Sequence, residues 1–397
     1  MDEKIWYAPN KFQAYGEEEI NAVVSCLRDG WLAGFGPRTI EFEERVSRYF
    51  GKRHGLFVNS GSSAILAGLA SLDLPPGCDV VTAACGFSTT VAPIMQLGLN
   101  PVFCDVDTTT YVPTPEQVKS AVTDNTKCII LPNLIGNKPD WEKIKELCPG
   151  ITLFEDSADT MTRTECTDIS TTSFYASHVI TAGGIGGMIM FNNDDHLKRA
   201  IMFRDWGRIG DNIEEPCERF NHSVDGIPYD WKFLYGVAGY HLKACEMNAA
   251  FGLVQMDKLD GFLKQRRQLI ERYIENLKNV PYYKLPDDSL KPNWLAMPIQ
   301  CPDRLELINY MEHNNVQTRV TFAGNITRHP AFRKYLKEYK NADKIMKDGF
   351  LLGAHHGMTL EDVDKVCTLL KHFAISKIGR TDLLPTFLSK PGGKYFH

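Results

Sequence analysis

Long apolar runs and an excess of positive charge are both missing from this chain. No stretch of about 18 uncharged apolar residues occurs, so we expect no membrane-spanning helix. Lys and Arg number 44 against 49 Asp and Glu, a net charge of -5, whereas a nucleic-acid-binding protein needs a basic face. The first residues, MDEKIWYAPNKF, lack the positive n-region and the apolar h-region of a secretory signal. We therefore expect a cytoplasmic protein that binds neither membranes nor nucleic acids.

Paired cysteines and metal-ligand spacings are also missing. The eleven cysteines are an odd number without a CxxC pair, and the eleven histidines contain no HExxH spacing. A disulfide framework or a zinc ribbon is therefore not expected. Most of the cysteines lie in apolar stretches such as PVFCDV, where cysteine behaves as a small buried hydrophobe. We expect reduced cysteines and no metal site.

The chain does contain a regular alternation of short apolar stretches with amphipathic ones. It runs from HGLFV to ITLFED, and it predicts an α/β fold with a mostly parallel sheet covered by helices on both faces. At 397 residues the chain is too long for one compact core. We expect a large α/β domain over 1–250, a small α+β domain over 251–375 and a loosely held tail over 376–397.

Two segments after this alternation have a different character. Residues 207–235 are polar, contain glycine and show no clear period, and loops of that length are usually functional or disordered. Residues 246–279 have good helical periodicity. We expect this second segment to be one long helix that leads into the smaller domain.

Three polar turns directly follow predicted strands, namely NSGSS, ACGFS and EDSAD. In open parallel sheets, ligands bind at the carboxyl ends of the strands. In NSGSS, backbone N–H groups at a helix start and the serine hydroxyls could hold a phosphate, because unpaired donors and the helix dipole favour an anion. A plain serine N-cap explains the same letters.

The other two turns contain a carboxylate and an aromatic ring. Asp156 follows the apolar strand ITLFE, where a carboxylate could keep a heteroaromatic nitrogen protonated or could simply cap the next turn. Phe87 in ACGFS could stack on a ring, but a lone aromatic residue after a strand is more often part of the core. Each of these residues taken alone leaves both interpretations open.

A basic residue stands in an unusual setting in TSFYASHVITAGGIGGMI. The serine–aromatic pair and the glycine-rich turn resemble the place where a vitamin-B6 enzyme carries its cofactor-binding lysine. The basic residue here is His178, which cannot form a Schiff base with an aldehyde. Histidine can carry protons, because its reference pKa lies near neutrality, although an ordinary buried histidine is the alternative.

Taken together and in order, these motifs resemble one family. VNSGSSA, FSTTVAPI, LPNLIGN, SFYASH, RDWGR and TRVTFAGN follow one another as in the DegT/DnrJ/EryC1/StrS sugar aminotransferase/dehydratase family of fold-type I pyridoxal-phosphate enzymes. The resemblance runs from GFGPRTIEFE to about residue 373. It implies a seven-stranded-type sheet in the large domain and a homodimer with shared active sites. The closest resemblance is to the nucleotide-4-keto-6-deoxyhexose 3-dehydratases of the ascarylose and colitose type.

The resemblance also implies roles for single residues. The cofactor phosphate would be held by Gly61, Ser62 and Ser173, and by His241 of a second subunit, where the family often has asparagine. The ring would be stacked by Phe87 and paired through its nitrogen with Asp156, and Asp159 stands where many aminotransferases of the family have glutamine. The segment that closes over the sugar or its nucleotide would contribute Arg319, Asn325 and Arg328.

His178 distinguishes the dehydratase branch in this resemblance. Aminotransferases of the family have lysine there, whereas the dehydratases resemble this sequence in having histidine. Pyridoxamine phosphate would then be held without a covalent bond, and its amine could condense with the C4 ketone of the sugar. A base would remove a proton from the cofactor, and the C3 hydroxyl would leave after protonation. We expect His178 to do both proton transfers.

The chain departs from the ascarylose branch at the cluster-binding positions. That branch holds an iron–sulfur cluster on four cysteines, whereas Ser157 and the single Cys217 stand in the corresponding segments here. We therefore expect no cluster, and glutamate as the amino donor of the colitose-type route is the alternative. Two other functions stay open: a B6-dependent nucleotide-sugar aminotransferase or isomerase, and a non-catalytic protein that binds the cofactor or a nucleotide sugar.

Overall fold

The computed structural model describes residues 4–10, 13–210 and 215–379, and its centre is one seven-stranded sheet. The strand order is β1-β7-β6-β5-β4-β2-β3. All pairs are parallel except those that β7 makes with β1 and β6, so the predicted mostly parallel α/β fold is confirmed. The strands are β1 (His54–Val58), β2 (Asp79–Ala83), β3 (Asn100–Cys104), β4 (Thr126–Pro132), β5 (Thr152–Asp156), β6 (Ile169–Ser173) and β7 (Gly187–Phe191).

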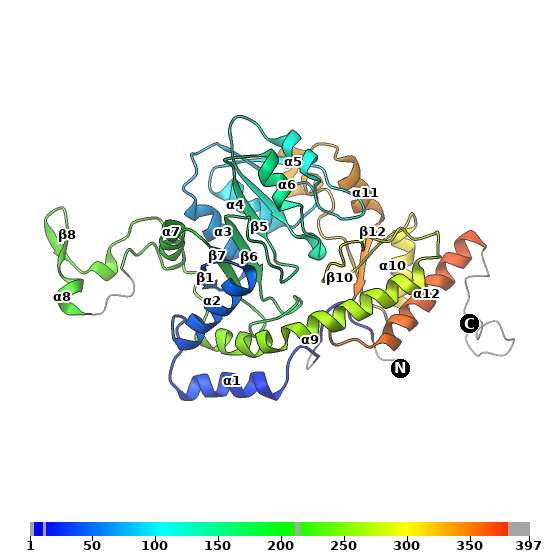
Figure 1. Cartoon of the computed structure of the whole chain (residues 1–397), viewed down its shortest axis with the longest axis horizontal. Helices are drawn as coiled ribbons and strands as arrows, with labels where there is room; N and C mark the ends of the chain where they lie inside the picture. The colour runs from blue at the N-terminus through cyan, green and yellow to red at the C-terminus, as the bar shows by residue number, and fades with distance from the viewer. Residues whose placement is uncertain (1–3, 11–12, 211–214, 380–397) are drawn as a thin grey trace.

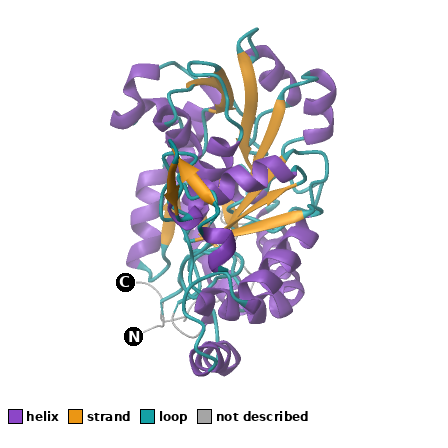
Figure 2. Cartoon of the chain, turned by 90° about the vertical axis from the view of Figure 1, so that its left-hand side faces the viewer, coloured by secondary structure: helices purple, strands orange, loops and turns teal. Residues whose placement is uncertain are grey.

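Helices cover both faces of this sheet (Figures 1 and 2). Successive strand residues point to opposite faces, so Val80 and Ile130 lie in one buried cluster while Val81 and Ile129 lie in another. Both faces are therefore apolar, as the continuous apolar strands predicted. The covering helices are α2 (Pro37–Phe50), α3 (Gly61–Ser71), α4 (Ser88–Gln96), α5 (Pro115–Ala121), α6 (Trp141–Leu147) and α7 (Asp194–Arg204), whereas α1 (Glu17–Arg28) packs on the long helix Glu246–Leu277.

One long helix, α9 (Glu246–Leu277), runs under the large sheet toward a second, smaller sheet (Figure 1). This confirms the long helix expected after residue 246. The small sheet has the order β10-β12-β11 and is antiparallel, and with its helices it agrees with the expected α+β character of this part of the chain. Its elements are β10 (Ala296–Gln300), α10 (Arg304–His313), β11 (Thr318–Val320), α11 (Lys340–Asp348), β12 (Gly349–Gly353) and α12 (Leu360–Ile378).

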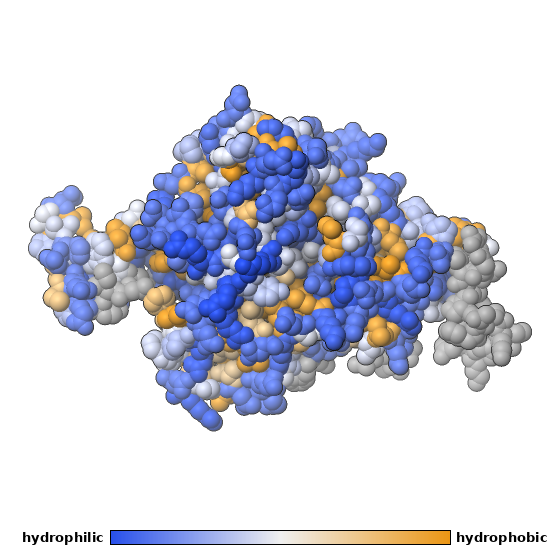
Figure 3. Space-filling model, viewed as in Figure 1, coloured by the Kyte–Doolittle hydropathy of each residue, from blue (hydrophilic) through white to orange (hydrophobic). Residues whose placement is uncertain are grey.

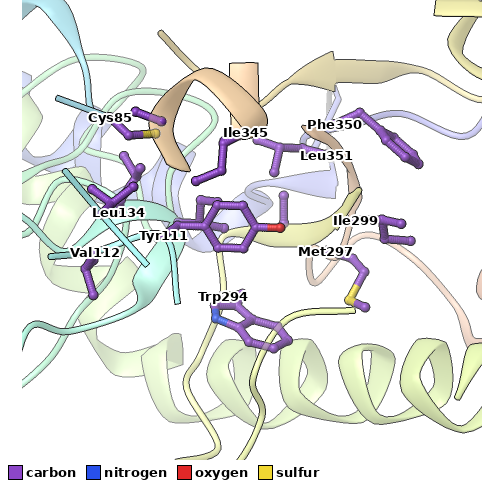
Figure 4. Packing of buried hydrophobic residues seen from close by; sticks show 14 of the residues in the cluster. Cys85, Tyr111, Val112, Leu134, Trp294, Met297, Ile299, Ile345, Phe350 and Leu351 are labelled. Atoms are coloured by element: carbon purple, nitrogen blue, oxygen red, sulfur yellow. The ribbon is translucent and has the colours of Figure 1, made fainter. Parts of the chain in front are cut away.

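The two sheets share one apolar cluster. Tyr111 and Leu134 from the first half of the chain pack among Trp294, Met297 and Leu351 from the second half (Figure 4). The proposed domain boundary after residue 250 lies inside α9, and that division of the chain stays a prediction. The shared cluster fixes the small sheet against the carboxyl ends of the large one.

The segment after α7 is more ordered than the sequence indicated. Instead of an irregular loop, it contains α8 (Pro216–Arg219), a hairpin of β8 (His222–Val224) and β9 (Ile227–Tyr229), and a short 3₁₀ turn (Trp231–Phe233). We call residues 215–240 the arm, because they project from the body (Figure 1) and expose apolar side chains (Figure 3). The most exposed of these are Phe220, Ile227 and Tyr235.

The expected tail is helical at its start, because α12 continues through residues 376–378 to its C-cap at Gly379. A left-handed glycine at this position is a common helix end. The rest of the predicted tail, 380–397, lies outside the described residues. Among the residues that are described, no helix is both long and apolar enough to cross a membrane.

Candidate active site

A cavity of about 280 Å³ lies where the strand ends of the large sheet meet the small sheet. It brings together seven of the eight residues that the sequence assigned to catalysis or to the cofactor, all except His241, as well as Tyr175 and Phe322. A larger and more open groove of about 850 Å³, between α5, α6 and residues 287–293, contains none of them. The cavity is lined by Ser60, Gly61, Ser62, Ile65, Phe87, Thr89, Pro132, Leu134, Asp156, Ala158, Asp159, Ser173, Tyr175, His178 and Phe322.

The turn between β1 and α3 provides the anion-binding end of the cavity. Ser60 is the N-cap, and its Oγ accepts a hydrogen bond from the N–H of Ser63 at 3.1 Å. The capping interpretation is therefore correct for Ser60, which leaves Ser62 exposed at the helix start with its Oγ 2.9 Å from Thr89 Oγ1. A Cβ on Gly61 would lie 2.6 Å from Ser173 Cβ, so only glycine fits against β6. These groups fit a phosphate.

Ser173 ends β6 directly beside this turn. Its Oγ accepts a hydrogen bond from the N–H of Tyr175 at 3.3 Å, and the side chain lines the cavity. Thr89 was not singled out from the sequence, although it stands two residues after Phe87 in FSTT. The close contact between Ser173 and Gly61 therefore places hydroxyl groups from β6, α3 and α4 around one anion-sized position.

Asp156 ends β5 and is only 5% exposed. Its Oδ2 accepts a hydrogen bond from Thr90 Oγ1 at 2.7 Å, and its Oδ1 accepts one from the N–H of Ala158 at 3.3 Å. Burial raises the pKa of Asp156 to about 6, against the lowering effect of the Thr90 hydrogen bond. A cationic N–H in the cavity would stabilise the ionised form, which is what a protonated pyridine nitrogen provides.

Two aromatic rings line one side of the cavity: Phe87 follows β2 of the large sheet, and Phe322 follows β11 of the small sheet. Phe87 precedes α4, is 52% exposed and therefore does not belong to the core. Its ring meets the edge of Phe322 at a centroid distance of 6.4 Å. Phe87 thus presents a ring to the cavity, as stacking on a cofactor requires. Phe322 lies in the motif TRVTFAGN, but the sequence does not indicate that it would lie near Phe87, which is more than 200 residues away.

The side chain of Asp159 accepts a hydrogen bond from a residue whose backbone is strained. Its Oδ2 accepts the N–H of Ile135 at 2.8 Å, and Ile135 is a buried β-branched residue with a positive φ of 64°. Its Oδ1 has no partner in the described chain and is accessible from the cavity. Burial, together with the nearby carboxyl of Asp156, raises the pKa of Asp159 to about 7.

His178 lines the same cavity as these carboxyls and stands in the chain between Ser173 and the glycine-rich turn. Its backbone N–H bonds the carbonyl of Tyr175 at 3.0 Å, and the Tyr175 and His178 rings are 6.0 Å apart. Nδ1 is buried without a partner in the described chain, and the residue lines the cavity. Burial lowers the pKa of His178 to about 4, so the ring is neutral at physiological pH and can accept a proton.

No lysine lines this cavity in the described chain. Lys243, which follows His241, lies 3.5 Å from Asp205 and 5.3 Å from the centre of the Trp206 ring, away from the cavity. His241 is exposed and stacks on Trp206, with ring centres 4.4 Å apart. It does not line the cavity of its own chain, and its role in a second subunit stays a prediction.

The structure does not bring the three predicted substrate residues into the cavity. Asn325 is fully buried and bonds Thr327, Lys337 and Asp343. The guanidinium of Arg328 pairs with Asp343, with Nη2 and Oδ2 2.8 Å apart. Arg319 is exposed and lies over the ring of Tyr7 at 5.4 Å. Contact between Asn325 or Arg328 and a substrate would require these bonds to break, so a structural role explains both residues better.

Ser157 and Cys217 stand in the two segments where the ascarylose branch binds its iron–sulfur cluster. Ser157 is fully buried, accepts from Asn133 Nδ2 at 3.0 Å and donates to the Thr160 carbonyl at 3.0 Å. Cys217 is exposed on the arm. Within residues 4–10, 13–210 and 215–379, no three His, Cys, Asp or Glu side chains group as metal ligands.

Several known proteins are similar to this chain over most of its length. The chain is 35% identical to a dTDP-4-dehydro-2,6-dideoxy-D-glucose 3-dehydratase of Saccharopolyspora spinosa, over 90% of this chain and 84% of that protein. It is 34% identical to the lipopolysaccharide biosynthesis protein RfbH of Salmonella typhimurium, over 92% and 91%. A solved structure of GDP-4-keto-6-deoxymannose-3-dehydratase with a trapped PLP–glutamate geminal diamine superposes with a TM-score of 0.82 at 25% identity, covering 92% of this chain and all of that one.

The family is settled by a match over most of the chain. Residues 13–371 match the model of the DegT/DnrJ/EryC1/StrS aminotransferase family, whose members use pyridoxal or pyridoxamine phosphate. The resemblance, the fold type and the cofactor predicted from the sequence are therefore confirmed. This chain, with histidine in place of a lysine at its cofactor cavity, belongs to the DegT/DnrJ/EryC1/StrS aminotransferase family.

Proposed function

We propose that this protein is a 3-dehydratase that uses pyridoxamine phosphate to remove the C3 hydroxyl of a nucleotide-linked 4-keto-6-deoxyhexose. One observation carries the proposal: the described lining of the cavity contains His178 and no lysine, beside a buried carboxyl and a phosphate-type turn. A site without a covalent anchor is suited to a cofactor that stays in its amine form. The relatives that are 34–35% identical, one of them named as a 3-dehydratase, support the same class of substrate.

The residues present fit the cofactor. Gly61, Ser62 and Ser173 would hold its phosphate, and Phe87 would cover one face of its ring. Asp156 would keep the ring nitrogen protonated, because burial raises the pKa of Asp156 and a positive charge beside it would stabilise the ionised carboxylate. When bound, the group would supply an amine for the C4 ketone and an acidic C–H whose electrons expel the C3 substituent.

His178 does the proton transfers in this proposal. Its neutral ring lines the cavity and would remove a proton there. The resulting imidazolium then protonates the leaving C3 hydroxyl, so a single residue serves as base and acid in turn. Asp159 faces the same space with an accessible oxygen and stabilises the positive charge while His178 carries the proton.

Glutamate is the amino donor that we propose for restoring the amine. The alternative, reduction through an iron–sulfur cluster, needs thiolate ligands that the described chain does not group together. Ser157, at the first of the expected ligand positions, already uses its hydroxyl in two hydrogen bonds. We further propose a homodimer in which His241 and the arm of one subunit complete the cavity of the other.

A B6-dependent aminotransferase or isomerase is the second candidate function, because the matched family is named for aminotransferases. A non-catalytic binding protein is less consistent with Asp156, because a buried carboxyl that lines the cavity suits activation of a ring nitrogen. Borohydride treatment of the protein with pyridoxal phosphate distinguishes a covalent from a non-covalent site. We expect a free-aldehyde spectrum and no adduct on the chain, and a stable adduct on a lysine would contradict the proposal.

A further inference from the structure

The carboxyl groups of the cavity lie at the end of β5, and a residue at the end of β4 holds this segment in place. Asn133 directly follows β4 and is 1% exposed. It does not line the cavity, although its neighbours Pro132 and Leu134 do. Its backbone N–H donates to the carbonyl of Asp156 at 2.8 Å. Asn133 therefore lies behind the cavity wall, in contact with the strand that carries Asp156.

The side-chain amide of Asn133 binds the same strand end. Its Nδ2 donates one hydrogen bond to Glu155 Oε1 at 2.7 Å and another to Ser157 Oγ at 3.0 Å. An amide nitrogen carries two hydrogens, so both donors are used. Together with the backbone bond to Asp156, these contacts hold three successive residues at the end of β5.

Glu155 fixes the orientation of this amide. It is fully buried, and its carboxylate also accepts hydrogen bonds from Thr164 Oγ1 at 2.7 Å and Ser170 Oγ at 2.6 Å. A rotated amide would place Asn133 Oδ1 against this carboxylate, and two acceptors repel each other. In the observed orientation Oδ1 is buried without a partner in the described chain, which costs stability. The two donors are therefore the part of the Asn133 side chain that has a use.

The same connection also holds the second carboxyl of the cavity. Two residues after Asn133, the N–H of Ile135 donates to Asp159 Oδ2 at 2.8 Å. Between the two carboxyls, Ser157 Oγ donates to the carbonyl of Thr160 at 3.0 Å. Because Asn133 also bonds Ser157, one hydrogen-bonded network holds the turn that carries both carboxyls.

We propose that Asn133 is a positioning residue of the cofactor site, which holds the end of β5 so that the carboxyl of Asp156 meets the ring nitrogen of the cofactor. Asn133 acts through Asp156 and touches neither the cofactor nor the substrate. The inference rests on one part of the proposed function, the pairing of Asp156 with the ring nitrogen, and does not depend on the loss of water. It also gives a role to Glu155, a buried carboxyl that the proposed reaction does not use.

The test is the Asn133→Leu variant, which removes both donors at nearly constant volume and adds no charge. Asn137→Leu is the matched control, because Asn137 is also buried and its Oδ1 accepts from Trp294 Nε1 at 2.8 Å, but it lines the larger groove and not the cavity. Both variants lose buried hydrogen bonds, so we expect both to lower the unfolding temperature. Only Asn133→Leu should change the cofactor site.

Two ligands separate the positioning of Asp156 from general damage. Calorimetry at pH 8, above the raised pKa of Asp156, about 6, measures affinity for pyridoxamine phosphate and for phenyl phosphate, which has a phosphate and a ring but no ring nitrogen. In Asn133→Leu we expect affinity for pyridoxamine phosphate to fall about tenfold and affinity for phenyl phosphate to stay unchanged, with no change of either in the control. NMR of bound cofactor labelled with ¹⁵N in the ring should show a protonated nitrogen in the wild type and partial deprotonation in Asn133→Leu.

Ser157→Ala is a milder second variant, which decides the question if Asn133→Leu does not fold. It removes only the bond from Asn133 Nδ2 to Ser157 Oγ and the bond from that hydroxyl to Thr160. We expect a loss of about threefold for pyridoxamine phosphate and none for phenyl phosphate.

Two results overturn the assignment: equal affinity for pyridoxamine phosphate in the folded variant and the wild type, or an equal loss for both ligands, which would indicate a general disturbance. The proposed function fails separately, if the wild type binds pyridoxamine phosphate but no 4-keto sugar loses water, and the binding data still decide the role of Asn133. If the wild type binds pyridoxamine phosphate no more tightly than phenyl phosphate, the pairing of Asp156 with the ring is wrong, and so is this inference.

Discussion

The carboxyl of Asp159 holds the N–H of Ile135 at 2.8 Å, and Ile135 is one of the few non-glycine residues with a positive φ. Such a conformation is strained for a β-branched side chain and persists only where the surroundings enforce it. The carbonyl of Ile135 is also fixed, 2.6 Å from the N–H of Leu295 at the start of the small-sheet region. The strained residue therefore ties a carboxyl of the cavity to the junction of the two sheets.

Replacing Asp159 with Asn should stabilise the protein without cofactor at pH 8. The amide oxygen can still accept the Ile135 N–H, while the raised pKa of Asp159, about 7, means that the folded state loses stability as pH rises from about 4 through 7. Thermal unfolding at pH 4 and pH 8 measures this. We expect a gain of about 1–2 kcal/mol at pH 8 and no gain at pH 4. Equal effects at both pH values would show that the carboxyl is not protonated in the fold.

Affinity for pyridoxamine phosphate should fall as pH drops below about 6, because the raised pKa of Asp156 then leaves a neutral carboxyl that cannot pair with a protonated ring. Thr90→Val should move this fall to higher pH and weaken binding about tenfold, since it removes a hydrogen bond to the carboxylate. Thr368→Val, which removes a hydrogen bond within α12, is the matched control. Fluorescence titration at several pH values measures both effects, and identical curves for Thr90→Val and the wild type would contradict the pairing.

His178→Asn should retain cofactor binding and lose water elimination by a factor of about 10²–10⁴, the range expected for removal of a general acid–base group. His178→Lys should gain an adduct with pyridoxal phosphate that borohydride traps and that peptide mapping places at residue 178. These two variants separate the chemistry of the residue from its position. Full activity in His178→Asn would assign the proton transfers to another group.

Introducing a thiol at position 157 should not create an iron–sulfur cluster. In Ser157→Cys, reconstituted without oxygen in iron and sulfide, we expect no iron or sulfide above the amount found in the wild type, because the described chain gathers no further ligands around this buried position. Metal analysis and visible absorbance measure the outcome. Stoichiometric iron and sulfide in either protein would favour the reductive route over glutamate.

The parts of this protein that follow local rules could be read from the sequence. The large sheet follows from continuous apolar strands, and the cavity follows from the rule that polar turns gather at the carboxyl ends of parallel strands. Asp156 and Phe87 were ambiguous one at a time, and the geometry selects the cavity because one is buried at a strand end and the other is 52% exposed. The arm was missed as structure, since its strands have three residues each and no period to detect.

Contacts between distant segments could not be read in this way. Asn325 and Arg328 stand in a family-like motif, but both bind Asp343, which lies in a helix that the sequence did not indicate. Phe322 joins the site only because the small sheet folds back onto the large one. Thr90 is a similar case, because its hydrogen bond to Asp156 spans 66 residues.

The most direct test of the central claim is a single turnover of the purified protein loaded with pyridoxamine phosphate. It is mixed with CDP-, GDP- and dTDP-linked 4-keto-6-deoxyhexoses, and the nucleotide sugars are followed by mass spectrometry, with His178→Asn in parallel. The proposed dehydratase predicts that at least one sugar loses water in the wild type and that the variant leaves it intact. An amino sugar formed without loss of water would contradict it.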